Sequence, residues 1–171
     1  MILISNIIDL LYKSGMPNLP SYQQHWNAIM KNFTPFIINE EIILHIPDAW
    51  KATDGEFGEY AFKNEDERIH LTASFIKMPK SQQIGVKEML EEATANLKSW
   101  ADFFSPITQH DHYATRYIMM QDQITLIAII GKTNYKEQIL ANLFFRTDGQ
   151  AVFDENRELM EQIITALEIK S

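Results

Sequence analysis

The sequence contains no cysteine. Disulfide bonds, thiolate zinc sites and cysteine nucleophiles are therefore excluded. Basic residues are also scarce, because 15 lysines and arginines stand against 23 aspartates and glutamates, which gives a formal net charge of −8. Nucleic acids and anionic membranes attract basic surfaces, so we expect neither as a partner. No apolar run reaches the roughly 20 residues of a membrane-spanning helix, so we expect no membrane insertion.

The sequence also lacks the common catalytic motifs. The serine hydrolase elbow, G-x-S-x-G, is missing. The GKTN stretch at 131–134 lacks the upstream glycine of a phosphate-binding loop, and a hairpin turn explains it. The acidic stretches 40–41, 65–67 and 91–92 could supply a general acid and base, but such stretches more often form solvated turns and helix faces, and a catalytic carboxylate needs a pocket to shift its pKa. We therefore expect no catalytic residues, no cofactor and no cofactor-binding residues.

A pair of histidines leaves one enzymatic alternative open. His110 and His112 stand two residues apart, so on an extended segment both imidazoles would project to the same side and could bind one metal ion. His70 or Asp111 would have to supply the third ligand. The pattern is thus compatible with a metal-dependent hydrolase, but a polar loop that enters a strand explains it better, because a histidine pair without a known ligand spacing is weak evidence for a metal site.

Residues 1–34 predict an N-terminal helical extension. Apolar residues recur at helical spacing over 2–14, and a capping box formed by Ser21 and Gln24 begins a second helix over 22–32. The segment lacks the positive n-region and the small-residue cleavage site of a signal peptide, so we expect a cytoplasmic protein. These helices could also mediate a homodimer.

The middle of the chain predicts strands followed by a helix. Apolar and polar residues alternate over 40–47, and 59–62 with 68–78 predict a hairpin around the charged turn KNEDE. Ser81 is the predicted N-cap of a long helix that ends before Pro106. The buried stripe of that helix would consist of Val86, Met89, Leu90, Ala93, Leu97, Trp100 and Phe104.

The last third of the chain predicts three strands and a helix. The strands 112–120, 124–130 and 135–146 are joined by short connectors, so neighbours should be antiparallel. The middle strand is apolar on both faces and should lie in the sheet centre. Asp154 is the predicted cap of the last helix, whose buried stripe would be Leu159, Met160, Ile163, Ile164 and Leu167.

This order of elements indicates an α+β protein. We expect one domain over 1–171 with a mainly antiparallel sheet of about six or seven strands and helices packed on its faces. Ile46-Pro47 with Trp50 at the end of the first strand, the hairpin, the helix, the three strands and the final helix resemble the PsbP-like superfamily over 39–171. That superfamily includes the extrinsic subunit of photosystem II, the yeast Ran-release factor, bacterial proteins of unknown function and chaperones of type VI secretion effectors.

The resemblance implies an α/β/α sandwich and a non-catalytic role in binding or assembly, without shared catalytic residues. We therefore expect a small soluble bacterial adaptor that acts through contacts with another protein. An alternative is a chaperone for an apolar segment of a secreted effector, because the eight methionines and the adjacent phenylalanines 103–104 and 144–145 suit adaptable apolar surfaces. The sequence does not indicate which surface binds the partner.

Overall fold

The computed structural model describes residues 32–56 and 58–170. The helices predicted over 2–14 and 22–32 lie outside this range, apart from Asn32. In chain order the described elements are β1 (Phe33–Ile37), β2 (Ile42–Pro47), β3 (Lys51–Thr53), β4 (Tyr60–Lys63), β5 (Ile69–Pro79), the 3-10 helix Lys80–Gln82, α3 (Val86–Thr94), the 3-10 helix Ala95–Leu97, β6 (Phe103–Phe104), β7 (Thr108–Gln109), β8 (Tyr113–Met120), β9 (Gln123–Thr133), β10 (Glu137–Asp148), α4 (Gln150–Ala166) and β11 (Glu168–Ile169).

These residues form two compact units, one comprising 32–48 with Thr165–Lys170 and the other comprising 49–164. The smaller unit contains a three-stranded antiparallel sheet with the order β1-β2-β11. Ile42, Leu44 and Ile46 of β2 are buried, as the alternation over 40–47 predicts. The sequence does not predict β1, because its proline, Pro35, disfavours a strand, but an edge strand tolerates proline.

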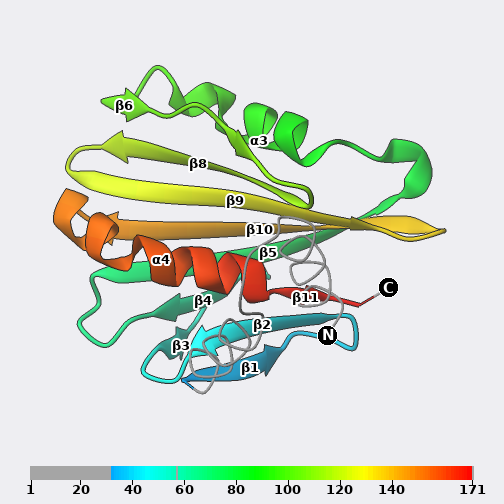
Figure 1. Cartoon of the computed structure of the whole chain (residues 1–171), viewed down its shortest axis with the longest axis horizontal. Helices are drawn as coiled ribbons and strands as arrows, with labels where there is room; N and C mark the ends of the chain where they lie inside the picture. The colour runs from blue at the N-terminus through cyan, green and yellow to red at the C-terminus, as the bar shows by residue number, and fades with distance from the viewer. Residues whose placement is uncertain (1–31, 57, 171) are drawn as a thin grey trace, which may run out of the picture. The chain divides into compact units, whose positions relative to one another are not determined.

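The larger unit contains an antiparallel sheet with the order β3-β4-β5-β10-β9-β8-β6, and β7 also pairs with β8 (Figure 1). The hairpin predicted over 59–78 is present as β4 and β5, and the three predicted strands are β8, β9 and β10. All side chains of β9 from Leu126 to Ile130 are buried. A strand that is apolar on both faces thus lies between two neighbours, as expected.

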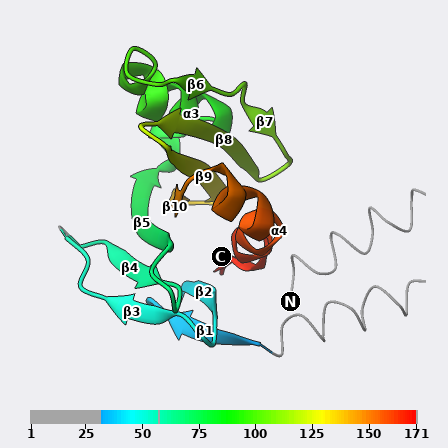
Figure 2. The same cartoon turned by 90° about the vertical axis from the view of Figure 1, so that its left-hand side faces the viewer.

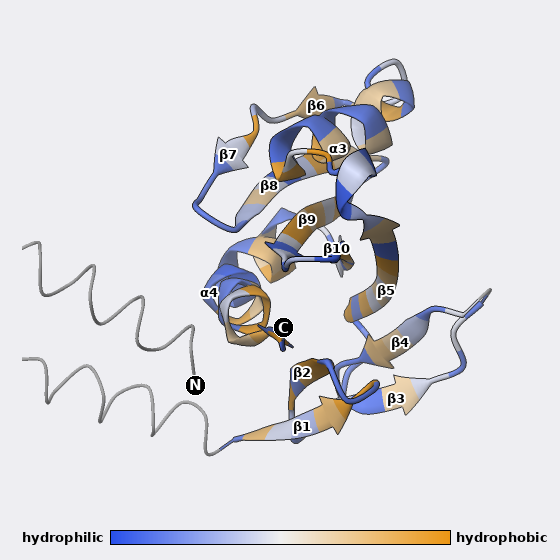
Figure 3. Cartoon of the chain, turned by 90° about the vertical axis from the view of Figure 1, so that its right-hand side faces the viewer, coloured by the Kyte–Doolittle hydropathy of each residue, from blue (hydrophilic) through white to orange (hydrophobic). Residues whose placement is uncertain are grey.

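One helix packs on each face of this larger sheet (Figure 2). On one face, Leu90 of α3 is fully buried among residues of β8, β9 and β10, namely Ala114, Ile118, Ile127, Ile129 and Leu140. On the other face, the ring of Phe153 in α4 lies 5.5 Å from the ring of Tyr117 in β8. Figure 3 shows apolar residues along β9, whereas α3 and α4 carry both polar and apolar residues. The predicted α+β class with helices on an antiparallel sheet is therefore confirmed.

The predicted helix from Ser81 to Phe104 is wrong in its extent. Gly85, not Ser81, is the N-cap of α3, and the α-helix ends at Thr94. The chain then forms a 3-10 helix over Ala95–Leu97, which changes the helical period, so that Ala101 and Phe104 pack against the core cluster but Trp100 does not. Trp100 is consequently 77% exposed, and Phe104 pairs as a strand residue with Ile118 at the outer edge of β8.

The predicted cap of the last helix is also wrong. The helix α4 begins at Gln150, directly after Gly149, whose φ of 87° suits glycine and ends β10 in a tight turn. Asp154 lies one turn into the helix, where its Oδ1 accepts a hydrogen bond from Gln150 Nε2 at 2.8 Å. The predicted buried stripe is present in Met160, Ile163 and Ile164.

A half-buried arginine fixes the end of α3 to the sheet. Arg116 Nη1 donates to Thr94 Oγ1 at 2.7 Å, and its guanidinium lies 4.1 Å from the centroid of the Phe104 ring. Thr94 Oγ1 in turn donates to the carbonyl of Leu90 at 2.7 Å. Burial lowers the pKa of Arg116 below its ordinary value, whereas the charge of Glu91 acts in the opposite direction. Arg116 therefore holds the end of α3 through one hydrogen bond and contacts β6 through a cation–π interaction with Phe104.

No helix within residues 32–56 and 58–170 combines the length and the apolar character needed to cross a membrane.

Truncation of Leu90 should destabilise the larger unit. We expect Leu90→Ala to lower the free energy of unfolding by about 2–5 kcal/mol, because it removes a buried side chain and leaves a cavity between α3 and the sheet. Glu92→Ala on the exposed side of α3 is the control and should change it by less than about 0.5 kcal/mol. Urea denaturation followed by circular dichroism measures both values.

The exposure of Trp100 can be tested in the same way. Trp100→Ala should change the free energy of unfolding by less than about 0.5 kcal/mol, because the side chain is 77% exposed. A buried tryptophan in a continuous helix would instead cost about 3–5 kcal/mol on truncation. A decrease of that size in the free energy of unfolding, measured by urea denaturation, would contradict the end of α3 at Thr94 and the exposure of Trp100.

Candidate functional site

A groove lies in the larger unit between the first turns of α4 and the sheet. It has a volume of about 300 Å³ and is lined by Phe103, Tyr117, Met119, Ile124, Gln150, Phe153, Asp154 and Arg157. We call it the α4 groove. Its floor comes from three strands, β6, β8 and β9, and its wall comes from α4.

The alternation of the strands directs these side chains into the groove. Arg116 and Ile118 of β8 face α3, so Tyr117 and Met119 between them face α4. Ile124 of β9 is the antiparallel partner of Met119 and therefore projects to the same side.

The wall follows from the spacing of four residues on α4. Gln150, Phe153, Asp154 and Arg157 recur at helical spacing and therefore share one side of the helix. One is an aromatic residue and three are polar. This side of α4 thus places its buried aromatic ring on the sheet and its polar groups along the groove.

Three aromatic rings in contact form the core of the groove, with Phe103 stacked on Tyr117 and Phe153 tilted against it. Tyr117 is the central ring, with centroid distances of 5.4 Å to Phe103 and 5.5 Å to Phe153. Phe153 is 2% exposed, whereas Phe103 is 44% exposed. The stack therefore has a fixed, buried base and an accessible end, which can contact an apolar ligand.

The polar wall supplies hydrogen-bonding groups at the rim. Asp154 accepts from Gln150, and Arg157 Nε donates to Glu161 Oε1 at 3.1 Å in an exposed ion pair. Each bond uses only part of the capacity of a carboxylate or a guanidinium, so further donors and acceptors remain for the backbone of a bound segment. An apolar floor with a few polar groups at the rim is typical of a binding site.

The chemistry of the groove favours binding. Its lining contains no histidine, serine or lysine that could act as a base or a nucleophile next to Asp154. Its volume of about 300 Å³ is at the lower end of the range for ligand pockets, about 300–1,000 Å³. It therefore suits a few apolar side chains better than a large cofactor.

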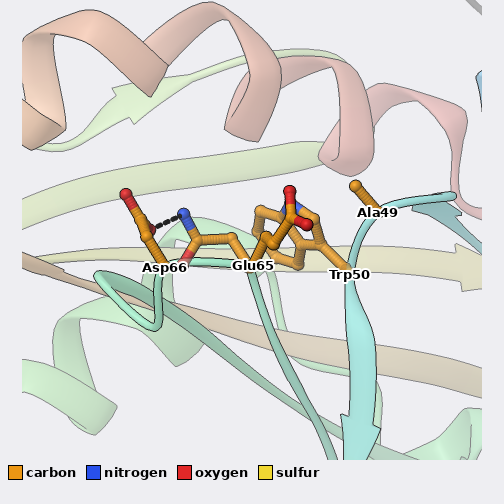
Figure 4. Close-up of a pocket in the computed structure, with 5 residues that line it drawn as sticks. Ala49, Trp50, Glu65 and Asp66 are labelled. Carbon is orange, nitrogen blue, oxygen red and sulfur yellow. Dashed lines mark hydrogen bonds between the residues drawn. The ribbon is translucent and has the colours of Figure 1, made fainter.

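A second hollow lies at the turn between β4 and β5 (Figure 4). It measures about 480 Å³ and is lined by Ala49, Trp50, Asn64, Glu65 and Asp66. The turn is rigid, because Asn64 Nδ2 donates to Asp66 Oδ1 at 2.6 Å and Asn64 Oδ1 accepts from the amide of Ile69 at 2.8 Å. Two carboxylates line this hollow and it has no stacked apolar floor, so the α4 groove is the stronger candidate.

The structure does not assemble a metal site around the predicted histidines. The ring of His110 stacks on Tyr113 at 4.2 Å, and the His112 carbonyl accepts from the amide of Gly131 at 2.9 Å. His70, expected as a third ligand, instead donates from Nε2 to the carbonyl of Glu67 at 2.9 Å. In the part of the chain that the structure describes, no three histidine, aspartate or glutamate side chains are placed to hold a metal ion.

The residues of the α4 groove are not identifiable as a site from sequence. The adjacent Phe103 and Phe104 indicate that one ring is exposed, and Phe103 is that ring. The helical spacing of Gln150, Phe153 and Arg157 is visible in the sequence, but only the packing of α4 on β8 shows that polar and aromatic residues line one groove.

No protein-family model matches the sequence, and no curated protein matches it either. Solved structures do match. The solution structure of cyanobacterial PsbP (CyanoP) from Synechocystis sp. PCC 6803 superposes with a TM-score of 0.56 at 11% identity, over 81% of this chain and 92% of that chain. The Ran-binding protein Mog1p of Saccharomyces cerevisiae superposes with a TM-score of 0.52 at 8% identity, over 81% of this chain and 95% of that chain.

A structure from Bacteroides thetaiotaomicron also matches, with a TM-score of 0.52 at 14% identity, over 82% of this chain and 49% of that chain. At such identities the likeness concerns the fold, and function has to be inferred from the site. The strand order and the helix on each face of the larger sheet agree with the sequence resemblance. The chain therefore has a PsbP-like fold.

Proposed function

We propose that this protein is a non-catalytic binding protein that holds an apolar segment of another protein in the α4 groove. The observation that carries this proposal is the stack of Phe103, Tyr117 and Phe153, which is buried at one end and accessible at the other. Aromatic side chains with an exposed face are enriched at sites of protein contact. The polar wall of α4 would orient the bound segment.

The fold is compatible with a protein-binding function. One structural neighbour, Mog1p, is described as a Ran-binding protein, so this fold serves protein binding there. The identity of 8% does not transfer the partner. Protein binding is therefore supported at the level of the fold, and the α4 groove is our assignment for this chain.

The groove would act as the anchor of a larger interface. Each buried large apolar side chain contributes about 1.5–3 kcal/mol, and a stable complex buries about 1,200–2,000 Å² in total. A segment seated in the groove would therefore have to extend further, along the polar wall of α4 or towards Trp100. That exposed side chain lies in the segment between the 3-10 helix Ala95–Leu97 and β6, the strand that contains Phe103.

A chaperone for an apolar segment of a secreted effector is a narrower version of this function. The position of Met119 in the groove favours it, because a flexible thioether adapts to varied apolar side chains. The cytoplasmic location and the homodimer expected from the sequence remain predictions. We do not propose the metal-dependent hydrolase, because the described residues offer His110 and His112 no third ligand.

Site-specific cross-linking tests the groove. We expect a photoreactive phenylalanine analogue at position 103 to give a discrete protein adduct in cells, because that ring is 44% exposed at the groove. The same analogue at Tyr135, which is 78% exposed in the turn at the far end of β9, is the matched control and should not give this adduct. Adducts are detected by gel shift and identified by mass spectrometry.

A groove variant makes this test specific. Met119→Asp places a charge in the apolar floor and should reduce the yield of the adduct at position 103 by about tenfold, which corresponds to about 1.4 kcal/mol of binding free energy. Circular dichroism confirms that the variant folds. The same adducts at both positions, or a yield that Met119→Asp leaves unchanged, would show that the α4 groove is not the binding site.

A further inference from the structure

We propose that the sheet face opposite the α4 groove is a second docking surface, which binds an acidic segment of a protein partner through a row of basic side chains. The row consists of Lys51, Lys63, His70 and Arg146, from four adjacent strands. We call it the basic row. It does not depend on the function proposed for the groove, because the two sites lie on opposite faces of the sheet.

The register of the sheet places these four residues side by side. Lys51 of β3 is the antiparallel partner of Lys63 of β4, and Lys63 is the partner of His70 of β5. His70 is in turn the partner of Arg146 of β10. Partners project to the same face with Cβ atoms about 4.5–5.5 Å apart, so the row is continuous across four strands.

The face that carries the row is open in the larger unit. Following the same register, Arg146 pairs with Thr125 and Thr125 with Ile118, which belongs to the cluster under α3. The row therefore shares a face with α3, but α3 packs on β8 and β9 (Figure 2), and on β5 the residue packed against the same cluster is Met78, at the other end of the strand from His70. Lys51 and Arg146 are exposed, and Lys63 and His70 are half-buried.

The positive charge of the row is only partly balanced. Glu67 forms an ion pair with Lys63, with Nζ and Oε1 2.6 Å apart. The hydrogen bond and charge of Lys63 lower the pKa of Glu67, and His70 and Lys51 contribute in the same direction to a smaller extent. Across residues 32–56 and 58–170, Lys51 and Arg146 form no ion pair with any carboxylate.

Residues of both charges flank one end of the row, because Glu65 and Asp66 lie in the turn after β4. On one side Arg68 and Asp148 adjoin it, joined by a hydrogen bond from the Asp148 amide to the Arg68 carbonyl, and their side-chain charges offset each other. On the other side the same face carries neutral residues, in the order Thr53, Ala61, Thr72 and Phe144. The exposed cations Lys51 and Arg146 therefore lie beside a neutral stretch of the same face.

An acidic protein segment is the occupant that these charges favour. Directly opposed like charges destabilise a sheet, and carboxylates placed between them would relieve that repulsion. A nucleic acid also carries negative charge, but it extends far beyond the row and would be repelled by the acidic remainder of the protein. A short run of aspartates or glutamates can confine its charge to the row.

A defined peptide tests this surface on the full-length protein. We expect a fluorescein-labelled peptide of alternating Glu and Gly residues to bind in about 50 mM NaCl and to lose most of its affinity in about 300 mM, because salt screens exposed charges. The same peptide with Gln in place of Glu should bind at least about tenfold more weakly. Fluorescence anisotropy measures both.

Matched variants assign the binding to the row. The double variant Lys51→Gln/Arg146→Gln should bind the Glu peptide with at least about tenfold lower affinity. Lys98→Gln/Lys136→Gln changes the net charge equally at exposed positions outside the row and should leave the affinity unchanged. Met119→Asp in the α4 groove should also leave it unchanged, so failure of one site is distinguishable from failure of the other.

Three results would overturn the proposal. The first is no binding of the Glu peptide at low salt. The second is an equal loss of affinity in the control double variant, which would show a nonspecific effect of charge. The third is a single-stranded DNA oligomer of matched charge that binds more tightly than the peptide and loses affinity in Lys51→Gln/Arg146→Gln, which would assign the surface to nucleic acid.

Discussion

The pairing of β10 with its two neighbours determines how the larger unit is organised. β10 pairs with β5 from Glu137↔Pro79 to Thr147↔Ile69, and with β9 from Gln138↔Thr133 to Asp148↔Gln123. Because successive side chains of a strand point to opposite faces, these two registers fix the face of every residue on three long strands. A slip by one residue would exchange the two faces.

The two proposed surfaces follow from that register. One face receives α4, and there Met119 and Ile124 join the aromatic stack of the α4 groove. The other face receives α3, which covers only part of it and leaves the basic row open. An apolar groove and a charged row on opposite faces of one sheet suit a protein that contacts two segments, of the same partner or of different partners.

The sequence predicts the strands well and the ends of the helices poorly. Alternation over β2 and β5, and the apolar run of β9, are local patterns that burial confirms. The end of α3 is not such a pattern, because Leu97, Trp100 and Phe104 keep helical spacing while the chain changes to a 3-10 helix and then to an edge strand. There the hydrogen bond of Arg116 to Thr94 and the pairing of Phe104 with Ile118 determine the structure, and both join residues distant in sequence.

The two surfaces are predictable only once the register is known. Lys51, Lys63, His70 and Arg146 are scattered along the chain and become neighbours through strand pairing. The α4 groove likewise joins residues of three strands, β6, β8 and β9, and one side of a helix. The histidine pair is the converse case, because a suggestive local spacing is not matched by any third ligand among the described residues.

Cross-strand backbone NOEs in isotopically labelled protein test the register of β10 with β5 and β9 directly. This register predicts backbone NOEs of Phe144 with Thr72 and Ile127, and of Arg146 with His70 and Thr125. NOEs shifted by one residue along β10 would contradict this register. In that case Arg146 would lie on the opposite face of the sheet and would not belong to the basic row.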